Sequence, residues 1–340
     1  DTITLPDVLA ARFSGKSAIV IRLLAVLIIL SMLSAYVAAQ FNAAGKMFDS
    51  LLDWPYQRGV LAGTAIVLIY TIIGGFRAVA WTDVVQALFM IGAMLILPLV
   101  LLVELGGVDA FWQQLNAQEA ASTLTHPMAN KTGMALIGFL AVWLGIPLGY
   151  CGQPHVLVRF MATRDATAIR RGAIISTTWV FLLFTGAVML GVLARAYYGT
   201  LEDQEMVLPL VATELLPGVI AGVMIAAVMA AICSTADSQL LVSASAISHD
   251  LYVHLLGHHP DNRIILRFNR LAVLLIGLTG MFVALGEVRV IFDFVLYAWA
   301  GLGAAFGPAI ILILLWRHTS ATGVIAGMAV GFITAIVWRE

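Results

Sequence analysis

Apolar segments long enough to cross a membrane recur along almost the whole chain, and this feature limits the fold more than any other. A helix needs about 20 residues to cross the hydrocarbon core of a bilayer. Only helices and closed barrels satisfy their backbone polar groups in lipid, and segments of this length are helices. The sequence therefore predicts an all-α polytopic membrane protein. We expect a single transmembrane domain over 1–340 with about nine transmembrane helices, at 18–44, 56–76, 83–105, 132–150, 172–197, 218–248, 266–286, 290–316 and 321–338.

Composition agrees with a chain whose main partner is the lipid bilayer. Charged residues make up 11% of the chain, against about 25% in typical soluble domains. The net charge of −1 offers no basic face for nucleic acid. The chain contains no GxxxxGK[ST] phosphate loop, no HExxH motif and no Ser/His/Asp arrangement in a structural context. We therefore expect neither an ATP-driven pump nor an enzyme.

The distribution of Lys and Arg predicts the orientation in the membrane. Cytoplasmic loops carry an excess of these residues. If Asp1 lies in the cytoplasm, twelve of the 18 Lys and Arg residues lie in cytoplasmic segments and six in outer ones. We expect a protein of the plasma (inner) membrane with the residue 1 side cytoplasmic and residues 1–16 as a cytoplasmic or interfacial lead-in. The start at Asp1 and the end within an apolar run predict a chain truncated at both ends.

A group of polar residues interrupts the apolar segment 218–248. Ala231, Ser234, Thr235 and Ser238 fall at i, i+3, i+4 and i+7, which is one face of a helix. Hydroxyl and carbonyl oxygens at membrane depth suit a small, partly dehydrated cation. A single hydroxyl in such a helix more often bonds the carbonyl one turn back. The whole cluster, together with the acidic Asp237, favours a Na⁺ site.

Other residue patterns allow two interpretations each. Asp83, after a Gly-Gly turn, has the pattern of a helix cap. His155 is more often a hydrogen-bonded structural histidine than a proton carrier. The loop histidines 249, 254, 258 and 259 are more often solvated than bound to a metal.

Glycines are spaced for helix packing near the end of the chain. Gly323, Gly327 and Gly331 form a small-xxx-small ridge that lets helix backbones approach closely. Around Gly303 and Gly307, ahead of Pro308, close packing and a moving hinge are equally expected.

Four motifs occur in order: GGFRAVAWTDVVQA (74–87), GYCGQPHVLVRFMA (149–162), STADSQLLVSASAISHDLY (234–252) and YAWAGLGAAFGP (297–308). Together they resemble the sodium/solute symporter family, closest to its sodium/proline symporter branch. The resemblance implies a partial LeuT-type inverted-repeat fold, in which discontinuous helices hold substrate and ion near the midplane. It identifies the spans with family helices four to twelve, without the first two core helices. It also implies Na⁺ ligation by the Ala231 carbonyl and the hydroxyls of Ser234 and Thr235.

The same resemblance implies roles for further residues. Tyr36 and Tyr150 match aromatic positions that line the substrate cavity. Ile146 replaces a cavity Trp of the proline transporters, and from this loss of a flat wall we expect weak proline selectivity. Asp83 matches an acid on the ion's inward exit route. Ser238 joins it as a candidate for a second cation site or for that route. Asp237 departs from the family, since many relatives carry a neutral residue there, and it could bind a second cation, lie on that route, tune cation affinity or take up a proton.

The function that follows is Na⁺-coupled secondary symport of a small organic solute, most simply an amino acid such as proline, by alternating access. Na⁺ is the co-transported ion. The alternative is a sensory input domain of a membrane histidine kinase, since some family members are fused to such modules. A channel is disfavoured because its filter needs a ring of ligands, whereas this stripe is one-sided.

Overall fold

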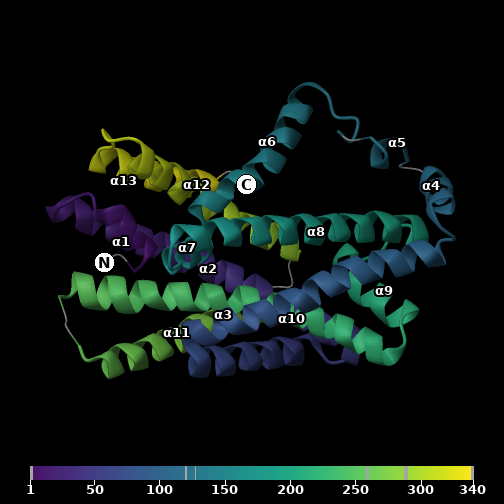
Figure 1. The fold of residues 1–340 in the computed structure, drawn as a ribbon, viewed down its shortest axis with the longest axis horizontal. Coiled ribbons are helices and arrows are strands. Elements are labelled where there is room, and N and C mark those ends of the chain that lie inside the picture. The colour runs from purple at the N-terminus through teal and green to yellow at the C-terminus, as the bar shows by residue number, and fades with distance from the viewer. Residues whose placement is uncertain (1–2, 119–120, 127, 258–259, 287–289, 338–340) are drawn as a thin grey trace.

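The computed structural model describes residues 3–118, 121–126, 128–257, 260–286 and 290–337, and the regular elements in these ranges are all helices. This confirms the predicted all-α class. The long helices run roughly along the longest axis of the molecule (Figure 1). In chain order the elements are α1 (Leu5–Ala10), α2 (Gly15–Leu52), α3 (Tyr56–Glu104), α4 (Val108–Asn116), α5 (Ala121–Leu124), α6 (Gly133–Gly149), η1 (Tyr150–Gly152), α7 (Pro154–Met161), α8 (Ala166–Tyr198), η2 (Gln204–Met206), α9 (Val207–Leu215), α10 (Gly218–Ser245), the π-helix η3 (Ala246–Leu255), α11 (Asn262–Gly286), α12 (Ile291–Leu315) and α13 (Ala321–Val337).

Within the described residues, seven helices are long and apolar enough to cross a membrane. The difference from nine has two causes. The predicted spans 56–76 and 83–105 both lie in α3, which bends at Gly75, where φ is 59° and ψ is −170°. Glycine reaches this left-handed conformation without strain because it has no Cβ. The predicted span 321–338 coincides with α13, which has 17 residues, and residue 338 lies outside the described part of the chain.

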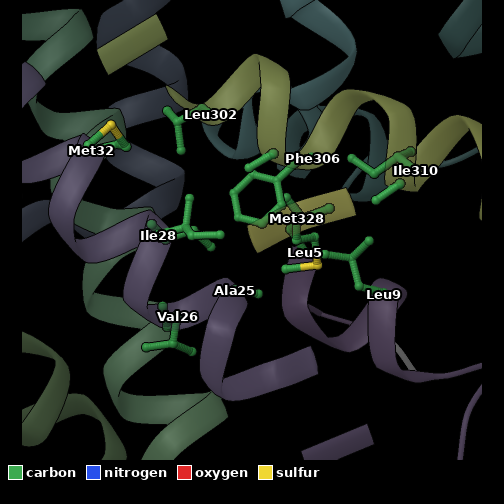
Figure 2. Packing of buried hydrophobic residues seen from close by; sticks show 14 of the residues in the cluster. Leu5, Leu9, Ala25, Val26, Ile28, Met32, Leu302, Phe306, Ile310 and Met328 are labelled. Atoms are coloured by element: carbon green, nitrogen blue, oxygen red, sulfur yellow. The ribbon is translucent and has the colours of Figure 1, made fainter. Parts of the chain in front are cut away.

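Helix α2 lies at the centre of the packing. It contributes buried residues to one apolar cluster with α1, α12 and α13, and to a second with α3, α10 and α11. Figure 2 shows the first cluster, in which Phe306 of α12 lies between Ile28 of α2 and Met328 of α13. A third cluster joins α3, α8 and α9. The central position of α2 explains why its residues are apolar around much of the helix.

The glycines of α12 serve close packing. A Cβ on Gly303 would lie 2.8 Å from the Gly149 Cα, and a Cβ on Gly152 would lie 2.7 Å from the Leu302 carbonyl oxygen. Both obstacles are backbone atoms, which cannot turn away as a side chain can. The predicted ridge on α13 forms an interface at one of its members, because a Cβ on Gly331 would collide with the Ala304 carbonyl, whereas Gly327 faces open space.

We expect Gly303→Ala to destabilise the protein by about 1–3 kcal/mol, because the added methyl group forces α12 and the end of α6 apart. The matched control is Gly307→Ala on the same helix, where the nearest atom to an added Cβ is 3.8 Å away. Thermal unfolding in detergent compares the two. Equal melting temperatures for both variants would contradict the close contact between Gly303 and Gly149.

Ionic contacts fix α1 against the bundle. Thr4 caps α1 and its hydroxyl donates to Asp250 Oδ1 at 2.9 Å. Arg22 of α2 lies 2.6 Å from a carboxylate oxygen of Asp7 and 2.6 Å from one of Asp250. Both carboxylates are buried. One guanidinium therefore joins α1, α2 and η3.

Candidate ion and substrate site

The predicted Na⁺ ligands lie on one turn of α10. The hydroxyls of Ser234 and Thr235 donate to the Ala231 carbonyl oxygen, at 3.1 and 2.9 Å. The three residues are partly buried. These are the backbone bonds expected of hydroxyls in a membrane helix, yet each hydroxyl oxygen keeps lone pairs to offer a cation. The turn thus gathers the three oxygen atoms of the predicted Na⁺ site on one face.

Asp237 and Ser238 continue this group of oxygens by one turn. The Ser238 hydroxyl donates to the Ser234 carbonyl at 2.8 Å and to Asp237 Oδ1 at 3.1 Å. Asp237 Oδ2 accepts a hydrogen bond of 2.7 Å from the Tyr70 hydroxyl of α3. Asp237 is fully buried, and no ion pair between described residues includes it. Because a buried carboxylate held only by hydroxyls is costly without a cation or a proton, the role of Asp237 in cation or proton binding stays a prediction.

Arg159 of α7 connects Asp83 to this cluster. Its Nη2 lies 2.5 Å from Asp83 Oδ2 and 2.7 Å from the Ser238 hydroxyl oxygen. Asp83 lies well inside α3, eight residues after the bend at Gly75, so it does not cap a helix as its sequence pattern alone favoured. The guanidinium therefore occupies the position between two predicted ligands of a second cation. No role was predicted for Arg159, although it lies in the second motif.

A cavity of about 520 Å³ opens beside this contact. Asp83, Arg159, Ser238 and His155 contribute its polar wall, and most of the remaining lining is apolar. Ala231, Ser234 and Thr235, one turn earlier on α10, are not among the described residues that line this cavity. Asp83 and Ser238 thus lie on a cavity wall. Ser238 is also hydrogen-bonded to the turn that carries Ala231, Ser234 and Thr235, called the triad below.

His155 is buried in the same wall. Burial, reinforced by the positive charge of Arg159, lowers the pKa of His155 to about 3. The ring is therefore neutral at physiological pH, which disfavours a proton carrier. The hydrogen bond expected of a structural histidine is not formed by its Nδ1, which is buried without a partner among the described residues.

The predicted substrate residues meet an aromatic cluster. The buried Tyr36 lies edge-on to His155, with ring centroids 6.1 Å apart, and Tyr150 lies edge-on to Trp299 of α12 at 4.6 Å. The Trp299 indole nitrogen donates to the Ile146 carbonyl at 3.0 Å. These contacts join the three predicted substrate residues into one cluster with His155 and Trp299, formed by Tyr36, Ile146 and Tyr150.

Trp299 changes the interpretation of Ile146. The absence of Trp at position 146 predicted that a flat wall is lost. The structure places the indole of Trp299 from α12 beside the Ile146 carbonyl and edge-on to the Tyr150 ring, so an aromatic side chain from another helix lies next to position 146. Trp299 lies in the fourth motif, but the sequence alone could not show which helix it faces.

Comparison with known proteins places the chain in a family. The profile of the Sodium:solute symporter family matches residues 1–331. The chain belongs to this family. It is 35% identical to the sodium/proline symporter of Escherichia coli (strain K12), over 100% of this chain and 68% of that protein. It is 34% identical to the osmoregulated proline transporter of Bacillus subtilis (strain 168), over 99% of this chain and 68% of that protein.

A solved structure shares the fold. It is the substrate-bound outward-open state of a Na⁺-coupled sialic acid symporter, with a TM-score of 0.71 and 20% identity, over 98% of this chain and 77% of that chain. The predicted LeuT-type symporter fold and the family resemblance are therefore confirmed. Membership of the family also confirms a multi-pass, sodium-coupled transporter rather than an enzyme.

Proposed function

We propose that this sodium:solute symporter imports proline, or a closely related amino acid, together with Na⁺. The observation that carries the proposal is the turn of three oxygen ligands on α10 in a chain about 35% identical to sodium/proline symporters. The aromatic cluster around Trp299 supports a small ring-bearing substrate, because flat rings pack well against an aliphatic ring.

The ion and the substrate would bind from the outside and leave on the inside. Na⁺ binds the Ala231 carbonyl, Ser234 and Thr235, and its binding favours the outward-facing state. Inward release passes Asp237, Ser238 and Asp83. In the described conformation Arg159 bridges Asp83 and Ser238, so this contact has to open before a cation can pass to the cavity.

The direction of import rests on the orientation of the chain. The excess of Lys and Arg in one set of loops supports a cytoplasmic residue 1 side in the cell membrane. Because both named relatives are transporters, transport is favoured over the sensory input domain.

The substrate can be identified by competition. Labelled proline uptake is measured in cells without other proline carriers that express the full-length protein, with and without Na⁺. We expect Na⁺-dependent uptake that unlabelled proline and its ring analogues inhibit. Equal proline uptake with and without Na⁺ would contradict the proposal, as would inhibition by other amino acids that is as strong as inhibition by proline.

Trp299→Ala should weaken apparent proline affinity by about tenfold, because the loss of an aromatic packing surface removes about 1–1.5 kcal/mol. The matched control is Trp143→Ala on α6, whose side chain is 55% exposed. Proline uptake at several concentrations measures both variants. An unchanged KM in Trp299→Ala would remove Trp299 from the substrate site.

A further inference from the structure

A cluster of metal-ligating side chains lies outside the transport site, where α1 meets η3. Asp7 Oδ2 lies 3.2 Å from His249 Nε2, and Asp7 Oδ1 lies 3.7 Å from His254 Nε2. One ligand atom from each of the three residues fits within a mutual distance of 4.8 Å. Ligand atoms about 2.0–2.2 Å from a tetrahedral Zn²⁺ lie roughly 3.3–3.5 Å from one another. The three ligand atoms therefore have to move slightly closer together to bind the ion.

The π-helix brings the two histidines together. His249 and His254 are five residues apart, and in an α-helix of 3.6 residues per turn they would point about 140° away from each other. In η3 their ring centroids are 4.6 Å apart. Such wide turns are frequent at functional sites. His254 is 39% exposed, so its ring has room to turn toward Asp7.

The hydrogen bonds around the cluster orient its ligand atoms. His254 Nδ1 lies 3.2 Å from the His249 carbonyl oxygen. A hydrogen on Nδ1 leaves the Nε2 lone pair free toward Asp7, which is how metal-binding histidines are commonly held. His249 Nε2 is buried, and Asp7 Oδ2 lies 3.2 Å from it. The backbone amides of Ile3 and Thr4 fix Asp7 Oδ2 at 3.1 and 3.3 Å.

The charges of the cluster favour a cation. Arg22 is the one guanidinium bonded to both Asp7 and Asp250. Two carboxylates therefore face one guanidinium. Asp250 Oδ2 is also buried and lacks a partner in the described structure. A divalent ion would add positive charge to a cluster in which carboxylates outnumber the guanidinium.

We propose that Asp7, His249 and His254 bind a divalent transition metal ion of the Zn²⁺ class. Imidazole nitrogen and carboxylate oxygen suit such ions, and three protein ligands leave a fourth position to water. The bound ion links α1 to η3, the continuation of the helix that carries the Na⁺ triad. Metal binding can be measured without transport, so its test does not depend on the proposed substrate.

The test is Zn²⁺ titration of the metal-stripped, full-length protein in detergent by isothermal titration calorimetry. We expect one ion per chain. His254→Gln should weaken Zn²⁺ binding by at least about tenfold, because even the loss of a residue that only hydrogen-bonds to a metal ligand weakens metal binding by about that factor. His254 is the primary variant because its partial exposure makes misfolding on substitution least expected. His249→Gln is the second variant, used where it elutes as wild type in size-exclusion chromatography.

The loop histidines at 258 and 259, expected from the sequence to be solvated like His249 and His254, lie outside the described residues and provide the control. The double variant His258→Gln/His259→Gln should keep wild-type affinity. Visible absorption of Co²⁺ added in place of Zn²⁺ should show nitrogen ligation that His254→Gln weakens. Wild-type affinity in His254→Gln, or loss of binding in the 258/259 double variant, would overturn the assignment.

Discussion

Thr235→Ala should raise the Na⁺ concentration for half-maximal uptake by roughly ten- to a hundredfold. Hydrogen bonds and dipoles on charged groups contribute about 1.5–3 kcal/mol each, and about 1.4 kcal/mol is a factor of ten in affinity. Ser234→Ala should act in the same direction. Protein amounts should stay near wild type, because each hydroxyl bonds only a carbonyl of its own helix. Uptake at a series of Na⁺ concentrations measures the shift.

Thr279→Ala is the matched control for this shift. Thr279 of α11 makes the same backbone bond, to the Leu275 carbonyl at 2.9 Å, but it is exposed on the outside of the bundle. Its loss should leave the Na⁺ dependence unchanged. Wild-type Na⁺ dependence in both Ser234→Ala and Thr235→Ala would remove the triad from the ion site.

Arg22→Ala should lower the free energy of unfolding by about 3–5 kcal/mol, the typical effect of removing one partner from a buried ion pair. The substitution leaves the carboxylates of Asp7 and Asp250, which are 5% and 0% exposed, without their shared guanidinium. Thermal unfolding in detergent at neutral pH measures the loss. Lys16→Ala, an exposed position on the same helix, is the control, and equal stability of the two variants would contradict the importance of the cluster.

The pH dependence of the free energy of unfolding tests whether the ionised Asp7 carboxylate contributes to the stabilising effect of Arg22. Burial alone would raise the pKa of Asp7, but the hydrogen bonds from Arg22 and from the Ile3 backbone, with the charge of Arg22, lower it from 3.8 to about 2. Ionised Asp7 therefore stabilises the folded state fully above about pH 4, and this contribution is lost as pH falls toward 2. We expect the stability difference between wild type and Arg22→Ala to shrink over that interval.

The parts of the site that depend on one helix could be predicted from the sequence. The spacing of Ala231, Ser234 and Thr235 gave their shared face, because helical periodicity alone fixes it. The family motifs identified the fold. That the triad binds Na⁺ stays a prediction.

The contacts between distant segments could not be predicted in the same way. Arg159 reaches Asp83 across 76 residues, and Trp299 reaches Ile146 across 153. Neither pairing follows from local pattern or composition. The convergence of His249 and His254 depends on a π-helix, whereas α-helical periodicity places these residues on different faces. The bend lies at Gly75, the second residue of a glycine pair that the sequence marked as a turn, and the structure shows helix on both sides of it.

The most direct test of Na⁺-coupled import is proline accumulation in proteoliposomes that contain the purified full-length protein. An inward Na⁺ gradient is imposed, with K⁺ replacing Na⁺ in the control. We expect internal proline to rise above the external concentration and to flow out again when a Na⁺ ionophore dissipates the gradient. Equal uptake with Na⁺ and K⁺, or uptake that never exceeds the external concentration, would contradict coupled transport.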